Sequence, residues 1–78
     1  RIAGDSMEPD FSDGDHVCVK STPVLNFGDI GIFFYAGSVY MKQYTRAGLR
    51  SLNPAYSLIK GNEEIRIIGK VLGKAMLA

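Results

Sequence analysis

Residues 30–45 read Ile-Gly-Ile-Phe-Phe-Tyr-Ala-Gly-Ser-Val-Tyr-Met-Lys-Gln-Tyr-Thr, and this stretch decides the fold. The first six residues are a continuous apolar and aromatic run, which predicts a strand that is buried on both faces or lies at the centre of a sheet. Residues 36–38, Ala-Gly-Ser, are typical of a tight turn. We therefore expect residues 39–45 to return antiparallel and to complete a hairpin.

Four further stretches on either side of the hairpin have strand patterns. They are residues 16–20, 49–53, 56–59 and 65–72. The pairs Gly14-Asp15 and Gly28-Asp29 predict turns that each introduce a strand, because glycine accepts a positive φ. Residues 7–11 predict a turn or a single helical turn, with Phe11 as an anchor in the core. The predicted fold is all-β: a small curved, partly closed antiparallel sheet with little helix.

The size and composition of the chain exclude several classes of protein. With 78 residues, the chain is expected to form one small domain with a modest core. A net charge of +1 is too small for a general polyanion-binding surface, so we expect no DNA contact by residues 1–78. Cys18 is the one cysteine, which fits a reducing cytoplasm, and no apolar run is long enough to span a membrane. Because Arg1 is not a methionine and lies close before the best motif, we expect a C-terminal piece of a longer protein.

The most informative residue of the hairpin is Lys42, which shares its face of the strand with Tyr40 and Tyr44 because side chains alternate along a strand. The ordinary interpretation is a lysine whose stem covers the rings while its ammonium stays in water. The functional interpretation is a neutral amine that acts as a base. Lowering the pKa from about 10.4 to about 7 costs roughly 4.6 kcal/mol, which burial among apolar groups can supply.

A second candidate lies near the start of the chain, in residues 4–9, Gly-Asp-Ser-Met-Glu-Pro. Pro9 fixes its own φ and disfavours a helical Glu8, so we expect Ser6 at a bend. A bend can present a hydroxyl and leave backbone N–H groups unpaired, as a nucleophile beside an oxyanion hole requires. The competing interpretation is a turn or a helix cap, in which Asp5 or Ser6 accepts hydrogen bonds from backbone N–H groups.

Over residues 2–73 the chain resembles the self-cleaving repressor peptidases, the family of LexA, UmuD and the phage repressors. The family's Gly-x-Ser-Met stretch, its following Gly-Asp pair and its hydrophobic-Lys-hydrophobic strand are similar to residues 4–9, 14–15 and 40–44. In that family a serine attacks a peptide bond of its own chain and a lysine is the general base. The resemblance assigns these roles to Ser6 and Lys42, and the oxyanion hole to the backbone N–H groups of Asp5 and Ser6.

The resemblance has further implications for the full-length protein. The family's scissile bond lies in a loop upstream of the serine, which would put it before Arg1. No cofactor is implied. A DNA-binding part would precede Arg1, and the RecA filament would stimulate cleavage. Asp5 is a departure from what an oxyanion site needs, because a carboxylate beside the nucleophile would weaken that site if it pointed inward.

Other chemistries have weaker support in the sequence. His16 is the only histidine, and it competes as a base for Ser6 or as a partner of Cys18 in a thiol dyad. A lone histidine on a strand is usually an ordinary residue, and without a second histidine or cysteine no metal site is expected. Three acidic residues lack the spacing and the closing glutamate of a calcium loop, so we expect them to cap turns. They are Asp10, Asp13 and Asp15.

Three classes of function are consistent with this sequence. The first is the C-terminal domain of a transcriptional repressor that cleaves itself and dimerises. The second is a dimerisation module of the same fold that does not cleave. The third is a serine protease similar to signal peptidases, which is disfavoured by the lack of a membrane segment and by Gln43-Tyr44 after Lys42, where a basic residue would be expected.

The C-terminal region is expected to form a two-fold homodimer. Residues 71–78 are more apolar than an exposed tail should be, and we expect the strand that continues into them to have an unpaired edge. A symmetric partner could cover this edge by antiparallel pairing, and a two-fold dimer would match two operator half-sites. The alternative is a monomer whose tail folds back over its own sheet.

Overall fold

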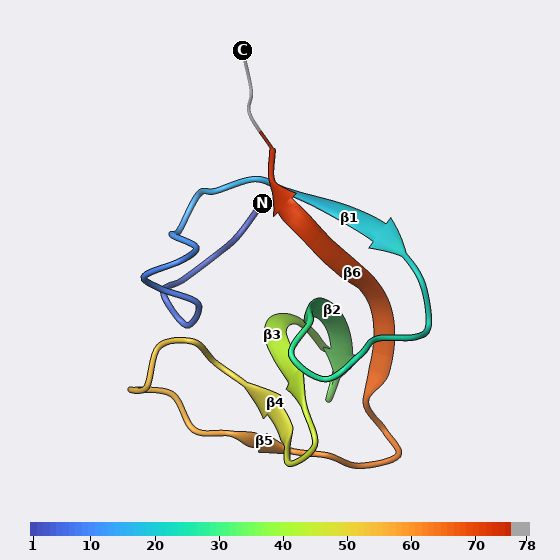
Figure 1. Cartoon of the computed structure of the whole chain (residues 1–78). Coiled ribbons are helices and arrows are strands. Elements are labelled where there is room, and N and C mark those ends of the chain that lie inside the picture. The colour runs from blue at the N-terminus through green and yellow to red at the C-terminus, as the bar shows by residue number, and fades with distance from the viewer. Residues whose placement is uncertain (76–78) are drawn as a thin grey trace.

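The computed structural model of the chain describes residues 1–75, which contain six strands and no helix. The strands are β1 (Val17–Ser21), β2 (Ile30–Tyr35), β3 (Ser38–Thr45), β4 (Gly48–Arg50), β5 (Ile59–Lys60) and β6 (Arg66–Lys74). They form one antiparallel sheet in the order β1-β6-β2-β3-β4-β5, as Figure 1 shows. The predicted all-β class is therefore confirmed.

The hairpin of β2 and β3 forms as the sequence predicts. Ile30 pairs with Gln43 and Tyr35 with Ser38, so the loop consists of two residues. Both have positive φ values, 50° for Ala36 and 79° for Gly37. Two positive φ values are the requirement of the tight turn that matches the twist of the two strands. The hairpin fixes the register of β3 and therefore the face on which Lys42 lies.

Strand β6 lies between β1 and β2, but each covers only part of it: β1 pairs with residues 69–74 and β2 with residues 66–70. Ile67 and Val71 are less exposed than Ile68 and Leu72, but the predicted alternation is interrupted by two register shifts, one at Ile68 opposite β2 and one at Leu72 opposite β1. The expected unpaired edge is present in part: β1 occupies one edge up to Lys74, whereas no described strand pairs with residues 71–74 on the side of β2. Residues 76–78 of the predicted dimer segment lie outside the described residues.

The hydrophobic core sits on β2 and β4. Leu25, Phe33 and Leu49 form its buried cluster, and four partly buried side chains pack against them. These are Tyr44, Ile59, Ile65 and Ile67. Full burial of one such large side chain stabilises a fold by roughly 1.5–3 kcal/mol. The predicted anchoring of Phe11 in the core is wrong, because its half-buried ring lies outside this cluster.

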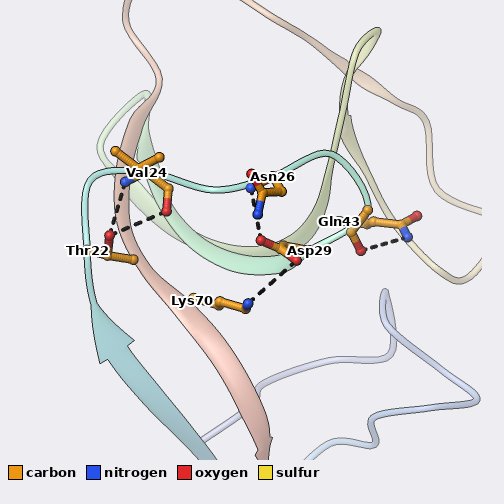
Figure 2. Close-up of polar contacts among 7 residues, drawn as sticks. Thr22, Val24, Asn26, Asp29, Gln43 and Lys70 are labelled. Atoms are coloured by element: carbon orange, nitrogen blue, oxygen red, sulfur yellow. Dashed lines mark hydrogen bonds and ion pairs between the residues drawn. The ribbon is translucent and has the colours of Figure 1, made fainter.

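The two Gly-Asp turns have the same construction. Asp15 accepts a hydrogen bond from the Ser12 N–H at 2.9 Å, and Asp29 accepts one from the Asn26 N–H at 2.9 Å. Each carboxylate also pairs with a lysine of β6, Lys74 at 3.2 Å and Lys70 at 3.8 Å. Figure 2 shows the second turn, in which the Gln43 side chain donates to the Gly28 carbonyl.

The segment after β4 departs from the prediction. Strands were expected over residues 49–53 and 56–59, but β4 ends at Arg50 and β5 contains only Ile59 and Lys60. The chain between them is a loop, and it lies beside the turn that contains Ser6 in Figure 1. The Asn53 N–H donates to the Ser6 carbonyl oxygen at 2.9 Å. Hydrogen bonds to another part of the chain have replaced the expected sheet pairing here.

Candidate active site

Ser6 lies on a turn that the residues around it hold in place. The Gly4 N–H donates to the Asp13 carboxylate at 2.7 Å. The Ile2 N–H donates to the Asp15 carbonyl and the Gly14 N–H to the Ile2 carbonyl, so the start of the chain is joined to the Gly14-Asp15 turn. Met7, directly after the serine, is buried and anchors the turn. The expected bend is confirmed, and Ser6 on this bend is half-buried.

Lys42 lies on β3 and is buried, with only 6% of its surface exposed. Its Nζ donates to Ser51 Oγ at 2.6 Å. The same nitrogen lies 5.8 Å from the ring centroid of Tyr40 and 5.6 Å from that of Tyr56. The prediction that Tyr40 flanks the amine is confirmed, whereas the second flanking ring comes from Tyr56 and not from Tyr44, which stacks on Phe33 in the core.

The environment of Lys42 favours its neutral form. Burial lowers the pKa of the Lys42 ammonium from its usual value of 10.5, because removal from water disfavours the charged state. A lysine that covers apolar surface with its stem and keeps its charge in water would be largely exposed. The ordinary interpretation of Lys42 is therefore wrong for this chain.

Ser6 and Lys42 line the same cavity, which has a volume of about 450 Å³. Its other walls come from the N-terminal segment and from β1, β2 and β3. The remaining lining residues are Arg1, Ile2, Ala3, Met7, Val17, Val19, Ile32, Val39, Tyr40 and Met41. Since β6 and β2 separate β1 from β3 in the sheet, a cavity bounded by both requires that the sheet curves. The curvature thus creates a mostly apolar hollow that both Ser6 and Lys42 line.

The loop after β4 contacts both candidate residues and was missed by reasoning from sequence. Asn53 donates from its side chain to the Asp5 carbonyl at 3.1 Å and from its backbone to Ser6. The Tyr56 hydroxyl donates to the Asp5 carboxylate, and this bond raises the pKa of the Tyr56 hydroxyl. The Asp5 carboxylate is thus turned toward Tyr56. This contact gives the carboxylate a hydrogen-bond partner on a tyrosine whose ring also flanks Lys42.

The backbone N–H groups of Asp5 and Ser6 form no hydrogen bond within residues 1–75. Both belong to the turn that exposes the serine to the cavity. Two unpaired N–H groups beside a hydroxyl are the donors that a tetrahedral oxyanion needs, so the arrangement is compatible with acyl transfer.

The competing candidates lie elsewhere. His16 and Cys18 are exposed, and neither lines the cavity of Ser6 and Lys42. Asp15 accepts a hydrogen bond within its own turn, as predicted, whereas Asp13 accepts one from Gly4 in the segment of Ser6. Among the residues that the structure describes, no group of three His, Cys, Asp or Glu side chains could hold a metal ion. The same residues include no helix that is long and apolar enough to cross a membrane.

The fold is an all-β sheet, and its cavity is lined by a serine on a turn and by a buried lysine on a strand. These features are those of a serine peptidase with a lysine base. The profile of the Peptidase S24-like family matches residues 1–72. The chain therefore belongs to the Peptidase S24-like family, and the resemblance to self-cleaving repressor peptidases is confirmed.

Its relatives among characterised proteins carry the name LexA repressor. The protein of Carboxydothermus hydrogenoformans is 35% identical over 80 residues, which cover 94% of this chain and 39% of that protein. The LexA repressor of Mycobacterium leprae is 38% identical over 77 residues, covering 92% of this chain and 32% of the relative. LexA repressor 1 of Nocardia farcinica is also 38% identical, and 35% of its length is covered. The chain thus spans about a third of the length of these relatives.

Proposed function

We propose that the chain, residues 1–78, is the C-terminal domain of a LexA-type repressor that cuts its own chain, with Ser6 as the nucleophile and Lys42 as the general base. The observation that carries this proposal is the burial of Lys42 in the wall of the cavity that Ser6 also lines. Membership of the Peptidase S24-like family and the names of the relatives support it.

In the proposed reaction, neutral Lys42 takes the proton of the Ser6 hydroxyl while Oγ attacks the carbonyl carbon of the scissile peptide bond. The N–H groups of Asp5 and Ser6 donate to the oxyanion of the tetrahedral intermediate. The intermediate collapses, the C–N bond breaks, and Lys42 returns the proton to the departing amine. A water molecule, deprotonated by the same amine, then hydrolyses the ester on Ser6.

The partners of the full-length protein follow from the same proposal. The relatives are named as repressors, so we propose that a part of the protein outside residues 1–78 binds DNA and that this domain dimerises. The RecA filament would stimulate cleavage in a cytoplasmic protein. No cofactor takes part, because the serine, the lysine and two N–H groups supply every proton transfer and charge contact of the reaction.

The first test is self-cleavage of the full-length protein at pH 7 to 10 without added protease, followed by gel electrophoresis. The rate should rise about tenfold per pH unit while Lys42 is mostly protonated, and then level off. Ser6→Ala and Lys42→Ala should both abolish cleavage, whereas His16→Ala should cut at the parental rate.

Two outcomes would contradict parts of this proposal. If Lys42→Ala cuts at the parental rate while Ser6→Ala does not, the lysine is not the base and His16 returns as the candidate. If the folded parental protein does not cut itself at any pH, the domain is a dimerisation module that does not cleave.

A further inference from the structure

We propose that Ser51 is a positioning residue for the general base: its hydroxyl holds Nζ of Lys42 so that the nitrogen lone pair faces Ser6. This inference rests on the proposed function. It adds a third side chain to the site, from a loop for which the sequence predicted only strand and turn.

The contact between the two side chains is short and shielded from water. Ser51 is 4% exposed and Lys42 is 6% exposed, and Nζ lies 2.6 Å from Oγ. This is the one side-chain hydrogen bond that the amine forms within residues 1–75. A buried amine without a partner would be costly, so the serine fixes where the nitrogen comes to rest.

The stereochemistry of a neutral amine explains what this contact achieves. Four groups surround the nitrogen: Cε, two hydrogens and one lone pair. One N–H donates to Ser51 Oγ, and the rings of Tyr40 and Tyr56 lie within 6 Å on other sides. Lys42 and Ser6 line one cavity, and the proposal directs the lone pair into that cavity. Rotation of the amine about the Cδ–Cε bond would lose the bond to Ser51.

The chemical nature of the partner matters as much as its place. A carboxylate at this distance would stabilise the ammonium and keep Lys42 protonated at neutral pH. A methyl group would leave an N–H unpaired. A hydroxyl satisfies the N–H without adding charge, which suits a base that must lose its proton.

Ser51 is itself held at two sides. It directly follows β4, whose Arg50 pairs with Gln43 next to Lys42 on β3. Two residues further on, Asn53 is bonded to the carbonyl oxygens of Asp5 and Ser6. A single short segment therefore fixes the position of the base relative to the turn of the nucleophile.

The experiment compares the parental full-length protein with Ser51→Ala and Ser51→Thr. Self-cleavage rates are measured from pH 6 to 11, and the Lys42 ammonium is titrated by NMR in Ser6→Ala backgrounds that cannot cut. In Ser51→Ala the plateau rate should fall about tenfold or more, because the amine is no longer held in line. The midpoint of the pH profile and the NMR pKa should both move to lower pH, because the ammonium loses its charge-assisted acceptor.

The conservative variant and the folding control separate positioning from loss of structure. Ser51→Thr keeps the hydroxyl and should retain the plateau within about threefold and the midpoint of the parent. Thermal unfolding shows which variants are folded at the assay temperature. A fall in rate by one factor at every pH, with an unchanged midpoint and an unchanged NMR pKa, would overturn the role of Ser51.

The test also separates this inference from the proposed function. A parental protein that cuts, with a Ser51→Ala variant that cuts identically, overturns only the role of Ser51. A parental protein that does not cut at any pH overturns the proposed function.

Discussion

The burial of Lys42 makes the stability of the fold depend on pH. Its stem and amine are buried, and its charged form is disfavoured there, so the unfolded chain holds the proton more tightly than the folded chain. Between the lowered pKa and 10.5 the unfolded state binds more protons, and the free energy of unfolding therefore rises with pH. Below the lowered pKa the cost of burying the ammonium is fully present.

A comparison of the parental chain with Lys42→Met should reveal this effect in urea unfolding at pH 6, 8 and 9.5. The stability of the parent relative to Lys42→Met should increase as the pH rises, by about 1.4 kcal/mol for each unit that separates the folded and unfolded pKa values. Lys20→Met, which removes an exposed lysine from β1, is the control. Parallel pH dependences of the parent and Lys42→Met would contradict the buried, neutral amine.

The limits of sequence reasoning are also clearest for single residues. The roles of Ser6 and Lys42 came from the family resemblance, whereas the place of Lys42 on a strand and the bend at Ser6 were predicted from local residue patterns. Ser51, Asn53 and Tyr56 were missed, since serine, asparagine and a nearby proline are ordinary turn residues. The residues that they contact lie elsewhere in the chain, and a local sequence pattern does not predict such contacts between separate segments.

At the scale of elements, the antiparallel pairing of β4 with β5 depends on a single glycine. Gly48 has a φ of +143°, and a Cβ built on it would overlap the carbonyl oxygen of Ile59 and approach the backbone N of Gly61. The two strands can therefore meet only with glycine at this position. β4 leads directly into the loop that contains Ser51. The backbone contact at Gly48 therefore helps to hold this loop in place, although Gly48 itself is not part of the site.

Gly48→Ala should destabilise the fold by more than about 3 kcal/mol, because the clash is with backbone that cannot move aside. Gly37→Ala is the matched control, since Gly37 also has a positive φ but its added Cβ would meet nothing within 4 Å. That variant should cost about 1 kcal/mol from backbone strain alone. Equal losses for the two variants in urea unfolding would refute the role of the close approach.

The prediction of elements succeeded where strands pair with their neighbours in sequence or alternate clearly. The hairpin of β2 and β3 and the long β6 appeared as expected. β4 and β5 were overestimated in length, because the apolar residues after Arg50 serve packing and turn contacts rather than a ladder. Which edge of β6 is paired was also not predictable, since it depends on pairing between the two ends of the described chain.

At the scale of the whole molecule, the exposed face of β6 is the part of the predicted C-terminal dimer segment that the structure describes best. Ile68 is 43% exposed and Leu72 is 63% exposed, and each lies at a register shift of the strand. We propose that a partner packs on these exposed side chains, beside the edge of residues 71–74 with which no strand of the described chain pairs.

Sedimentation of the parental chain over a concentration series should give a dimer that Leu72→Glu weakens at least about tenfold, since a charge would be buried in the contact. Leu58→Glu changes another exposed leucine outside β6 and should leave the association unchanged. A parental mass that stays monomeric at high micromolar concentration, or a dimer that tolerates Leu72→Glu, would remove this face from the interface.

The place of β6 in the sheet has a consequence for the synthesis of the protein. The strand made last among the six separates β1 from β2, and β1 has no other neighbour in the sheet. Val17 and Val19 of β1 can therefore close the cavity around Ser6 and Lys42 only after residues 66–74 have left the ribosome. Folding of such a topology follows translation instead of accompanying it. A nascent chain is thereby kept from assembling the candidate site of Ser6 and Lys42 before residues 66–74 are made.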